Sequence, residues 1–159
     1  MTNYIEPKGE NNTMHITRAT IEDLSRVAPL FDLYRGFYHQ TSDLPGATEY
    51  IQARLENSDS TIFLAEIDGE DVGFVQLYPT YSSISMQKSW ILNDLYVLEG
   101  ARKHGVGEAL MKRAQQLGKE TGANAIELST AINNTRAQHL YEKLNYRRET
   151  DFYTYTLHL

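Results

Sequence analysis

The segment Leu95-Tyr-Val-Leu-Glu-Gly-Ala-Arg-Lys-His-Gly-Val-Gly-Glu-Ala-Leu110 decides how this chain folds. An aliphatic run ends at Val97, a loop carries glycines at positions 105 and 107, and apolar residues at helical spacing follow. Such glycines let a backbone approach a ligand closely. The first turn of a helix offers N–H groups without helical acceptors, at the positive end of its dipole. The segment therefore predicts a phosphate-binding site, to which Arg102, Lys103 and His104 add positive charge.

The loop by itself leaves a simpler interpretation open, in which Gly105 and Gly107 only shape a tight turn from strand to helix. The loop differs from the phosphate-binding loop of nucleotide hydrolases, because no Gly-Lys-Ser/Thr follows. It also differs from the dinucleotide fingerprint, because Leu110 stands where that motif needs glycine. Nucleotide hydrolysis and hydride transfer are therefore disfavoured.

The residues around this segment predict one domain over residues 14–159, preceded by a poorly ordered polar tail over residues 1–13. Thr20 is expected to cap the first helix, with Asp23 as the reciprocal acid. The sequence Leu44-Pro-Gly is expected to break helical structure, and Asp68-Gly to turn a hairpin. Strands are expected at 14–18, 61–67, 72–78, 90–97, 125–130 and 152–159, helices around 24–31, 49–55, 106–121 and from 134 onwards, and a loop at 79–88.

Composition excludes several classes of function. The 159 residues, 41% of them hydrophobic, are typical of one soluble globular domain. The chain has no cysteine, so disulfides, thiolate metal sites and cysteine nucleophiles are excluded. A net charge of −6 disfavours nucleic acid as a partner. No apolar run is long enough for a membrane span and residues 1–13 lack a signal-peptide core, so we expect a cytoplasmic protein, and we assign no metal.

A second motif joins the first. The run Asn134-Thr-Arg-Ala-Gln-His-Leu-Tyr-Glu-Lys-Leu-Asn-Tyr146, together with the glycine loop before it, resembles the two central motifs of the GNAT acyltransferase superfamily. The element order from residue 14 to 159 is similar to that family's fold as well. The resemblance implies an α/β (α+β) fold, in which a mixed, mostly antiparallel twisted sheet is flanked by about four helices. It also implies acetyl-coenzyme A as cofactor.

The resemblance assigns residues to coenzyme A. Backbone groups of the strand should pair with the pantetheine arm, and N–H groups from Lys103 to Glu108 should cradle the pyrophosphate. Asn134 should bond near the pantetheine, and Tyr141 should lie beside the sulfur. The cofactor-binding residues implied in this way are Leu95, Tyr96, Val97, Arg102, Lys103, His104, Gly105, Val106, Gly107, Glu108, Asn134 and Tyr141.

The implied chemistry is acetyl transfer to a primary amine by direct attack, with no covalent enzyme intermediate. A strand N–H near Leu95 would hold the oxyanion, and Tyr141 would protonate the leaving thiolate. A simpler interpretation of Tyr141 is a core aromatic on a helix face. A non-catalytic acyl-coenzyme A sensor and a nucleotide-binding module stay open as other functions.

Two departures from the family pattern matter. Asn145-Tyr146 replaces the usual Gly-Phe, and asparagine tolerates the left-handed conformation that glycine supplies there. Asn93-Asp94 stands where polyamine acetyltransferases of this superfamily carry Glu-Asp. Because asparagine is no base, the deprotonating group is Asp94, a water relay or another acid such as Glu127. This departure also disfavours a polyamine acceptor.

The acceptor itself is open. Tyr38 and His39 are candidates for the acceptor site together with Asn93 and Asp94, although the first two would equally suit simple surface packing. Small amines, amino acids, aminoglycosides and protein N-termini all remain possible acceptors, and a small-molecule amine is the favoured class. Phe152, Tyr153 and Tyr155 alternate on the expected last strand, which hints at burial against a second copy in a homodimer.

Overall fold

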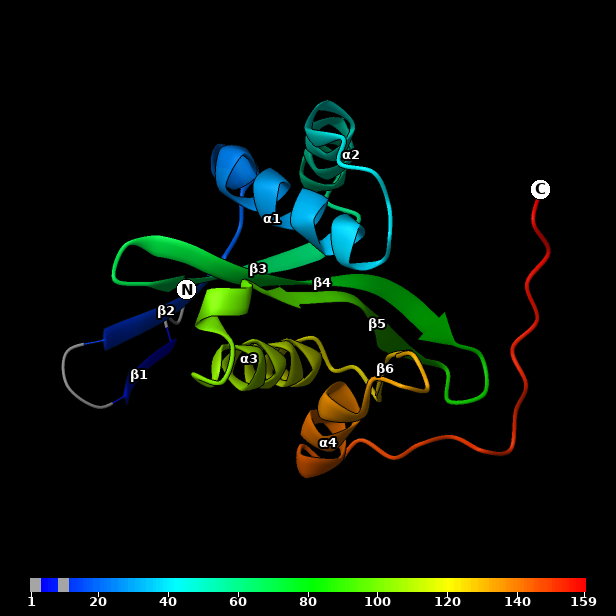
Figure 1. Cartoon of the computed structure of the whole chain (residues 1–159). Coiled ribbons are helices and arrows are strands. Elements are labelled where there is room, and N and C mark those ends of the chain that lie inside the picture. Colours follow the sequence, from blue (N-terminus) through cyan, green and yellow to red (C-terminus); the bar gives the residue numbers. More distant parts are fainter. Residues whose placement is uncertain (1–3, 9–11) are drawn as a thin grey trace. The chain divides into compact units, whose positions relative to one another are not determined.

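The computed structural model describes residues 4–8 and 12–159 (Figure 1). The chain divides into two compact units, Met1–Leu128 and Ser129–Leu159, and each is described by itself. That residues 14–159 form one domain stays a prediction. Among the described residues, no helix combines the length and the apolar character that crossing a membrane requires.

The first unit is built on a six-stranded sheet in the order β1-β2-β3-β4-β5-β6. Neighbouring strands are antiparallel from β1 to β5, whereas β5 and β6 are parallel. The strands are β1 (Tyr4–Lys8), β2 (Asn12–Arg18), β3 (Thr61–Ile67), β4 (Glu70–Ser82), β5 (Gln87–Val97) and β6 (Ile126–Glu127). The parallel pair arises because a helix crosses over between β5 and β6.

Three helices of this unit cover the two faces of the sheet (Figure 1). Helices α1 (Leu24–Phe37) and α2 (Leu44–Asn57) pack together on one face, and α3 (Val106–Glu120) lies on the other. Phe31, Ile51 and Phe74 belong to the buried cluster under α1 and α2. On the other side, a methyl group at Gly73 would lie 2.7 Å from the Tyr96 carbonyl oxygen and against α3. The middle of the sheet is therefore buried on both faces, which explains the apolar run of β4.

The mixed, mostly antiparallel sheet and the four α-helices confirm the predicted fold class. The predicted capping box is present, because the Asp23 carboxylate accepts from the Thr20 backbone N–H at 2.9 Å. The predicted turn at Asp68-Gly69 joins β3 to β4, and both residues have positive φ, 51° and 84°. The second unit holds the fourth helix, α4 (Thr135–Lys143).

Several predicted boundaries were wrong. Residues 4–8 form a strand inside the tail that was expected to lack order, while residues 1–3 and 9–11 lie outside the described residues. The loop expected at 79–88 shrinks to a turn at 83–86, because β4 and β5 pair from Pro79↔Trp90 to Ser82↔Gln87. Helix α2 begins at Leu44, since Pro45 is compatible with a first helical turn and Asp43 caps Gly46 N–H at 3.0 Å. The strand expected at 125–130 shrinks to two residues.

The expected C-terminal strand was also wrong. Residues 152–159 have no regular structure, and Phe152, Tyr153 and Tyr155 are exposed. Alternating aromatic and polar residues are compatible with a strand, but a strand forms only where a neighbour supplies ladder hydrogen bonds. The alternating pattern does not show whether such a neighbouring strand is present.

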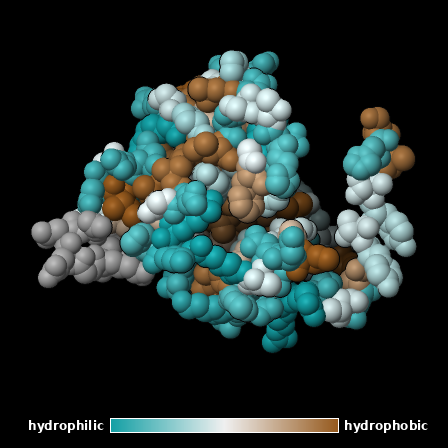
Figure 2. All heavy atoms as spheres, viewed as in Figure 1, coloured by the Kyte–Doolittle hydropathy of each residue, from teal (hydrophilic) through white to brown (hydrophobic). Residues whose placement is uncertain are grey.

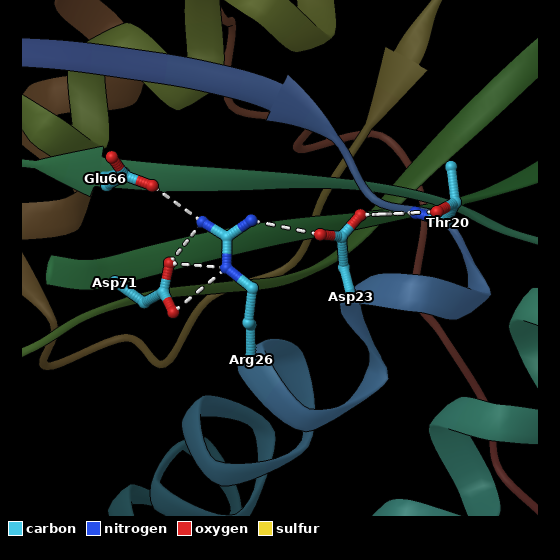
Figure 3. A network of polar contacts seen from close by, with 5 residues as sticks. All are labelled: Thr20, Asp23, Arg26, Glu66 and Asp71. Atoms are coloured by element: carbon cyan, nitrogen blue, oxygen red, sulfur yellow. Dashed lines mark hydrogen bonds and ion pairs between the residues drawn. The ribbon is translucent and has the colours of Figure 1, made fainter. Parts of the chain in front are cut away.

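One charged network ties α1 to the sheet (Figure 3). The Arg26 guanidinium reaches three carboxylates: Asp71 through Nε and Nη2, Glu66 through Nη2 at 2.8 Å, and Asp23 through Nη1 at 3.0 Å. These hydrogen bonds, those to Asp71 first, raise the pKa of Arg26 above its ordinary value. The two contacts with Asp71 are bidentate, because two N–H groups of the guanidinium donate to the two oxygens of one carboxylate.

Replacing Arg26 with glutamine is expected to lower the free energy of unfolding by roughly 2 kcal/mol, because three neighbouring carboxylates lose their shared cation. Urea denaturation monitored by circular dichroism measures this change. The control is Arg54→Gln, which breaks one ion pair with Asp59 and a cation–π contact with Tyr50 and should cost less. Equal losses in the two variants would contradict a networked role for Arg26.

Candidate active site

The glycine loop enters α3 as the sequence predicted. Gly105 precedes the helix with φ 78°, a left-handed conformation that suits glycine, and Lys103 also has positive φ, 69°. Helix α3 then begins at Val106, so the N–H groups of its first turn point out of its N-terminal end. Lys103 and His104 are exposed beside them. The loop therefore presents backbone donors and positive charge at one helix end.

The last residues of β5 offer backbone groups at an open edge. The Leu98 N–H donates to the Val72 carbonyl of β4 at 2.8 Å. Because the C=O and N–H of one peptide plane point in opposite directions, the Val97 carbonyl points away from β4. By the two-residue period of a strand, the backbone groups of Leu95 share that side. The Val97 carbonyl accepts from Arg102 Nε at 2.9 Å and keeps a second lone pair.

A bulge at Asn93 decides which residues face that edge. In the register of the described strands Gln76 pairs with Asp94 and Leu77 with Leu92, so Asn93 has no position opposite it. Before the bulge, Trp90 N–H donates to Ala125 at the β6 side. After it, Leu95 and Val97 point to that side instead. Since β6 pairs only with Trp90 and Ile91 over the described part of the sheet, the edge from Leu92 onwards has no strand partner there.

Asp94 is a buried carboxylate beside the bulge, and its side chain is 2% exposed. Gln76 Nε2 donates to its Oδ2, and Asn93 Nδ2 donates to its Oδ1 at 2.8 Å. Burial raises the pKa of Asp94 above its ordinary value, although hydrogen bonds from Gln76, Asn93 and Tyr34 oppose that rise. A carboxylic acid with a raised pKa is a stronger base once ionised, so Asp94 is suited to accept a proton.

Tyr34, Tyr50 and Tyr78, from three different elements, form a tyrosine cluster near this carboxylate. The Tyr34 hydroxyl of α1 donates to the Asn93 carbonyl at 3.3 Å, and Tyr34 packs edge-on against Phe74. The hydroxyls of Tyr78 in β4 and Tyr50 in α2 are 2.6 Å apart. Burial, the bond to Tyr50 and the charge of Asp94 all raise the pKa of Tyr78. The Tyr78 phenol therefore stays protonated at neutral pH.

Two of the residues predicted for the acceptor, Tyr38 and His39, lie at the end of α1. Tyr38 is the residue after the last turn of α1, is half-exposed, and lies with its ring 5.1 Å from that of Tyr34. His39 is exposed in a left-handed turn with φ 64°. Arg102 lies over Phe37, so the glycine loop and the end of α1 are neighbours. In the view of Figure 2, hydrophobic residues lie among hydrophilic ones over the region of α1.

The second unit carries the other predicted residues on α4. Asn134 caps that helix, because its Oδ1 accepts from Ala137 N–H at 3.3 Å. The rings of Tyr141 and Tyr146 lie 6.1 Å apart. Asn145 has φ 69°, which confirms the left-handed conformation expected where the family pattern has glycine. Asn134 therefore has a structural role in α4 in addition to the cofactor contact that the resemblance implies.

Residues 27–146, which hold the glycine loop, the bulged strand and α4, match the acetyltransferase (GNAT) family. The chain belongs to this family. It is 45% identical over 146 residues to the uncharacterized N-acetyltransferase YhfO of Bacillus subtilis, and the match covers 92% of this chain and 98% of that protein. A probable acetyltransferase of Haemophilus influenzae is 30% identical, with 76% and 83% covered.

A solved structure described as a probable acetyltransferase superposes on this GNAT chain with a TM-score of 0.85. The two share 42% identity, and 91% of this chain and 97% of that one are covered. The chain is therefore an acyltransferase, an N-acetyltransferase of the GNAT type. Enzymes of this family generally use acetyl-coenzyme A.

The structure of the first unit brings some predicted residues of this GNAT enzyme together and adds others. Asn93 and Asp94 are adjacent to Tyr34, and Tyr38 is in ring contact with Tyr34, whereas Glu127 is exposed in β6. Sequence reasoning missed Tyr50, Gln76 and Ser60, of which Tyr50 bonds to Tyr78 and Ser60 bonds to Gln76 beside Asp94. One signal was available: Gln76 interrupts an otherwise apolar strand, and a buried amide needs partners.

Proposed function

We propose that this GNAT enzyme transfers the acetyl group of acetyl-coenzyme A to the primary amine of a small molecule by direct attack. The observation that carries the proposal is Asp94, a buried carboxylate with a raised pKa beside an open strand edge and a tyrosine cluster. The proposal needs no enzyme nucleophile, and the chain has no cysteine.

The residues of the first unit fit coenzyme A. The open backbone groups of Leu95 and Val97 suit the amides of an extended pantetheine arm, with Tyr96 between them. The loop Arg102-Lys103-His104-Gly105-Val106-Gly107 and the N–H of Glu108 suit the pyrophosphate. Resemblance to the family adds Asn134 and Tyr141. The cofactor would supply an acetyl thioester.

Each proton of the reaction has a proposed carrier. As nitrogen bonds to the acetyl carbon, the amine loses a proton, which Asp94 accepts. A backbone N–H near Leu95 stabilises the negative charge on the acetyl oxygen. When the carbon–sulfur bond breaks, Tyr141 donates the proton that the thiolate needs, and solvent restores its phenol. Asp94 and Tyr141 are thus the proposed catalytic residues.

The tyrosine cluster supports an acceptor amine carried on an uncharged, apolar or aromatic body. The rings of Tyr34 and Tyr38 are 5.1 Å apart and lie close to Asp94 through the Tyr34–Asn93 bond. A tyrosine face attracts an ammonium group, and Asp94 supplies the opposite charge. We include Tyr38, His39, Asn93 and Asp94 in the acceptor site.

We further propose that the enzyme is a cytoplasmic homodimer. Light scattering of the purified protein would measure its molar mass and so test this assembly.

An amine-panel screen tests this function. Purified enzyme, acetyl-coenzyme A and single amines are incubated, and acetylated product is detected by mass while free thiol is quantified. The panel contains arylalkylamines, alkylamines, amino acids, polyamines, aminoglycosides and peptides with free N-termini. We expect at least tenfold higher kcat/KM for amines on an apolar body than for polyamines, because the site offers one buried carboxylate.

Two outcomes would contradict the proposal. Preferential turnover of peptide N-termini would make the enzyme a protein acetyltransferase. Coenzyme A binding by calorimetry without thiol release from any amine would make it a sensor.

A further inference from the structure

A chain of hydrogen bonds leads from Asp94 across the sheet to the start of β3. Gln76 Nε2 donates to Asp94 Oδ2, and Ser60 Oγ donates to Gln76 Oε1 at 2.9 Å. Gln76 is completely buried in β4, between the apolar Val75 and Leu77. Ser60 lines a separate surface hollow of about 410 Å³ together with Arg18, Thr61 and Ile62. The chain therefore connects the candidate base to a polar group outside the tyrosine cluster.

Burying an amide here is costly unless both of its ends are bonded. An apolar side chain of similar length would fill the same space without that cost. The presence of a buried amide at this position therefore calls for an explanation. Its carbonyl oxygen accepts from Ser60, and its amino group donates to Asp94. An amide can join a hydroxyl on one side to a carboxylate on the other, because it carries an acceptor and a donor.

The Gln76 amide could respond to the proton of Asp94 by changing its direction. When Asp94 is ionised, its oxygen accepts from Gln76 Nε2, and the Ser60 hydroxyl donates to Oε1. When Asp94 is protonated, an amide rotated by half a turn would accept the acid proton at Oε1 and donate to Ser60 Oγ. A hydroxyl serves as donor or acceptor, so both arrangements are satisfied. The arrangement in the structure, with Gln76 Nε2 facing Asp94, is compatible with an ionised carboxylate.

We propose that Gln76 and Ser60 are positioning residues for Asp94, with Ser60 orienting the Gln76 amide so that its N–H supports the carboxylate that takes the amine proton. This inference rests on the proposed function. Neither residue touches the reacting atoms, so both act through Asp94. The hydroxyl of Ser60 is the one group of this hydrogen-bond series that can change from donor to acceptor by rotating its proton.

The other groups around Asp94 titrate outside the relevant range. Asn93 on the same strand is neutral, and Tyr34 of α1 bonds to Asp94. Tyr78 of β4 senses the charge of Asp94 and bonds to Tyr50 of α2, while Arg54 of α2 acts on Tyr78. Phenols ordinarily titrate near pH 10 and arginine above pH 12. The acidic limb of a rate profile between pH 4 and 8 is assigned to Asp94 by its loss in Asp94→Asn and its persistence in His39→Gln and His104→Gln.

The test is the pH dependence of kcat/KM in the full-length enzyme with its best amine. Gln76→Met removes the N–H donor at similar volume and should move the acidic limb up by about one pH unit, since the ionised form loses a hydrogen bond. Ser60→Ala should move the limb in the same direction by less. Ser60→Thr restores a hydroxyl and should restore the wild-type limb. At pH above the limb, all three variants should return to within about threefold of wild-type kcat/KM.

Each outcome decides something. A uniform loss of rate with an unmoved limb in Gln76→Met and Ser60→Ala would mean that the two residues only maintain the core. Should Gln76→Met not fold, as judged by circular dichroism and coenzyme A binding, the Ser60→Ala and Ser60→Thr pair gives the same answer. The role of Asp94 as the base fails separately, if Asp94→Asn keeps the acidic limb, whereas the proposed function itself fails if no amine of the panel releases thiol. If Asp94→Asn abolishes the limb and Gln76→Met leaves it unmoved, only the positioning role is overturned.

Discussion

Replacing Tyr141 with phenylalanine is expected to lower kcat about 100-fold while the dissociation constant for coenzyme A changes less than about twofold. The phenol is the proposed donor of the proton that the leaving thiolate requires, whereas the ring and its packing remain in the variant. A 100-fold loss corresponds to about 2.7 kcal/mol of transition-state stabilisation. Stopped-flow or steady-state thiol release gives kcat, and calorimetry gives the affinity.

The matched control is Tyr146→Phe. The ring of Tyr146 lies 6.1 Å from that of Tyr141, and the Tyr146 hydroxyl has no proposed role in catalysis. We expect turnover close to wild type in this control. A large loss of coenzyme A affinity with unchanged turnover in Tyr141→Phe would assign the hydroxyl to cofactor binding. A 100-fold loss in both variants would point to general damage to α4.

Replacing Asp94 with asparagine is expected to lower kcat/KM by about 10²–10³-fold at pH 7, because the variant has no carboxylate to accept the amine proton. The side-chain volume is kept, but asparagine has one acceptor oxygen where Asp94 has two, so either Gln76 or Asn93 must rotate its amide to accept from the new N–H. The acidic limb of the rate profile should disappear at the same time. Glu127→Gln is the control, since that exposed acid of β6 should be dispensable.

The same Asp94→Asn variant should be more stable than the wild type at neutral pH. Burial raises the pKa of Asp94, so folding favours its protonated form and the folded state binds more protons than the unfolded state. Stability of the wild type therefore falls as pH rises from the unfolded value near 4 through the raised value. Asparagine removes this loss, and we expect Tm to rise by roughly 3 °C at pH 7.

Differential scanning calorimetry at pH 4 and pH 7 measures this effect. The gap in Tm between variant and wild type should be small at pH 4 and larger at pH 7. A gap of the same size at both values, or a less stable variant at pH 7, would contradict an energetically costly buried charge. A gain in stability together with a loss of activity would mark Asp94 as a residue kept for chemistry.

Local residue patterns predicted the parts of the fold that depend on local physics. Thr20 and Asp23 form their capping box within four residues, and Asp68-Gly69 turns its hairpin by backbone preference alone. The loop at Gly105 needs only a left-handed residue before an amphipathic helix. The strand expected at 152–159 failed for the opposite reason, because alternation cannot supply a neighbouring strand.

The sequence by itself determined the family, the glycine loop at the start of α3 and the candidacy of Asp94 and Tyr141, since short motifs carry these features. Only the tertiary structure decided what surrounds Asp94. Tyr34, Gln76 and Asp94 are 18 to 60 positions apart along the chain. They meet because β4 pairs with β5 in one particular register and α1 packs over these two strands. The bulge at Asn93 sets that register, and a one-residue shift in pairing leaves no trace in a linear pattern of residues.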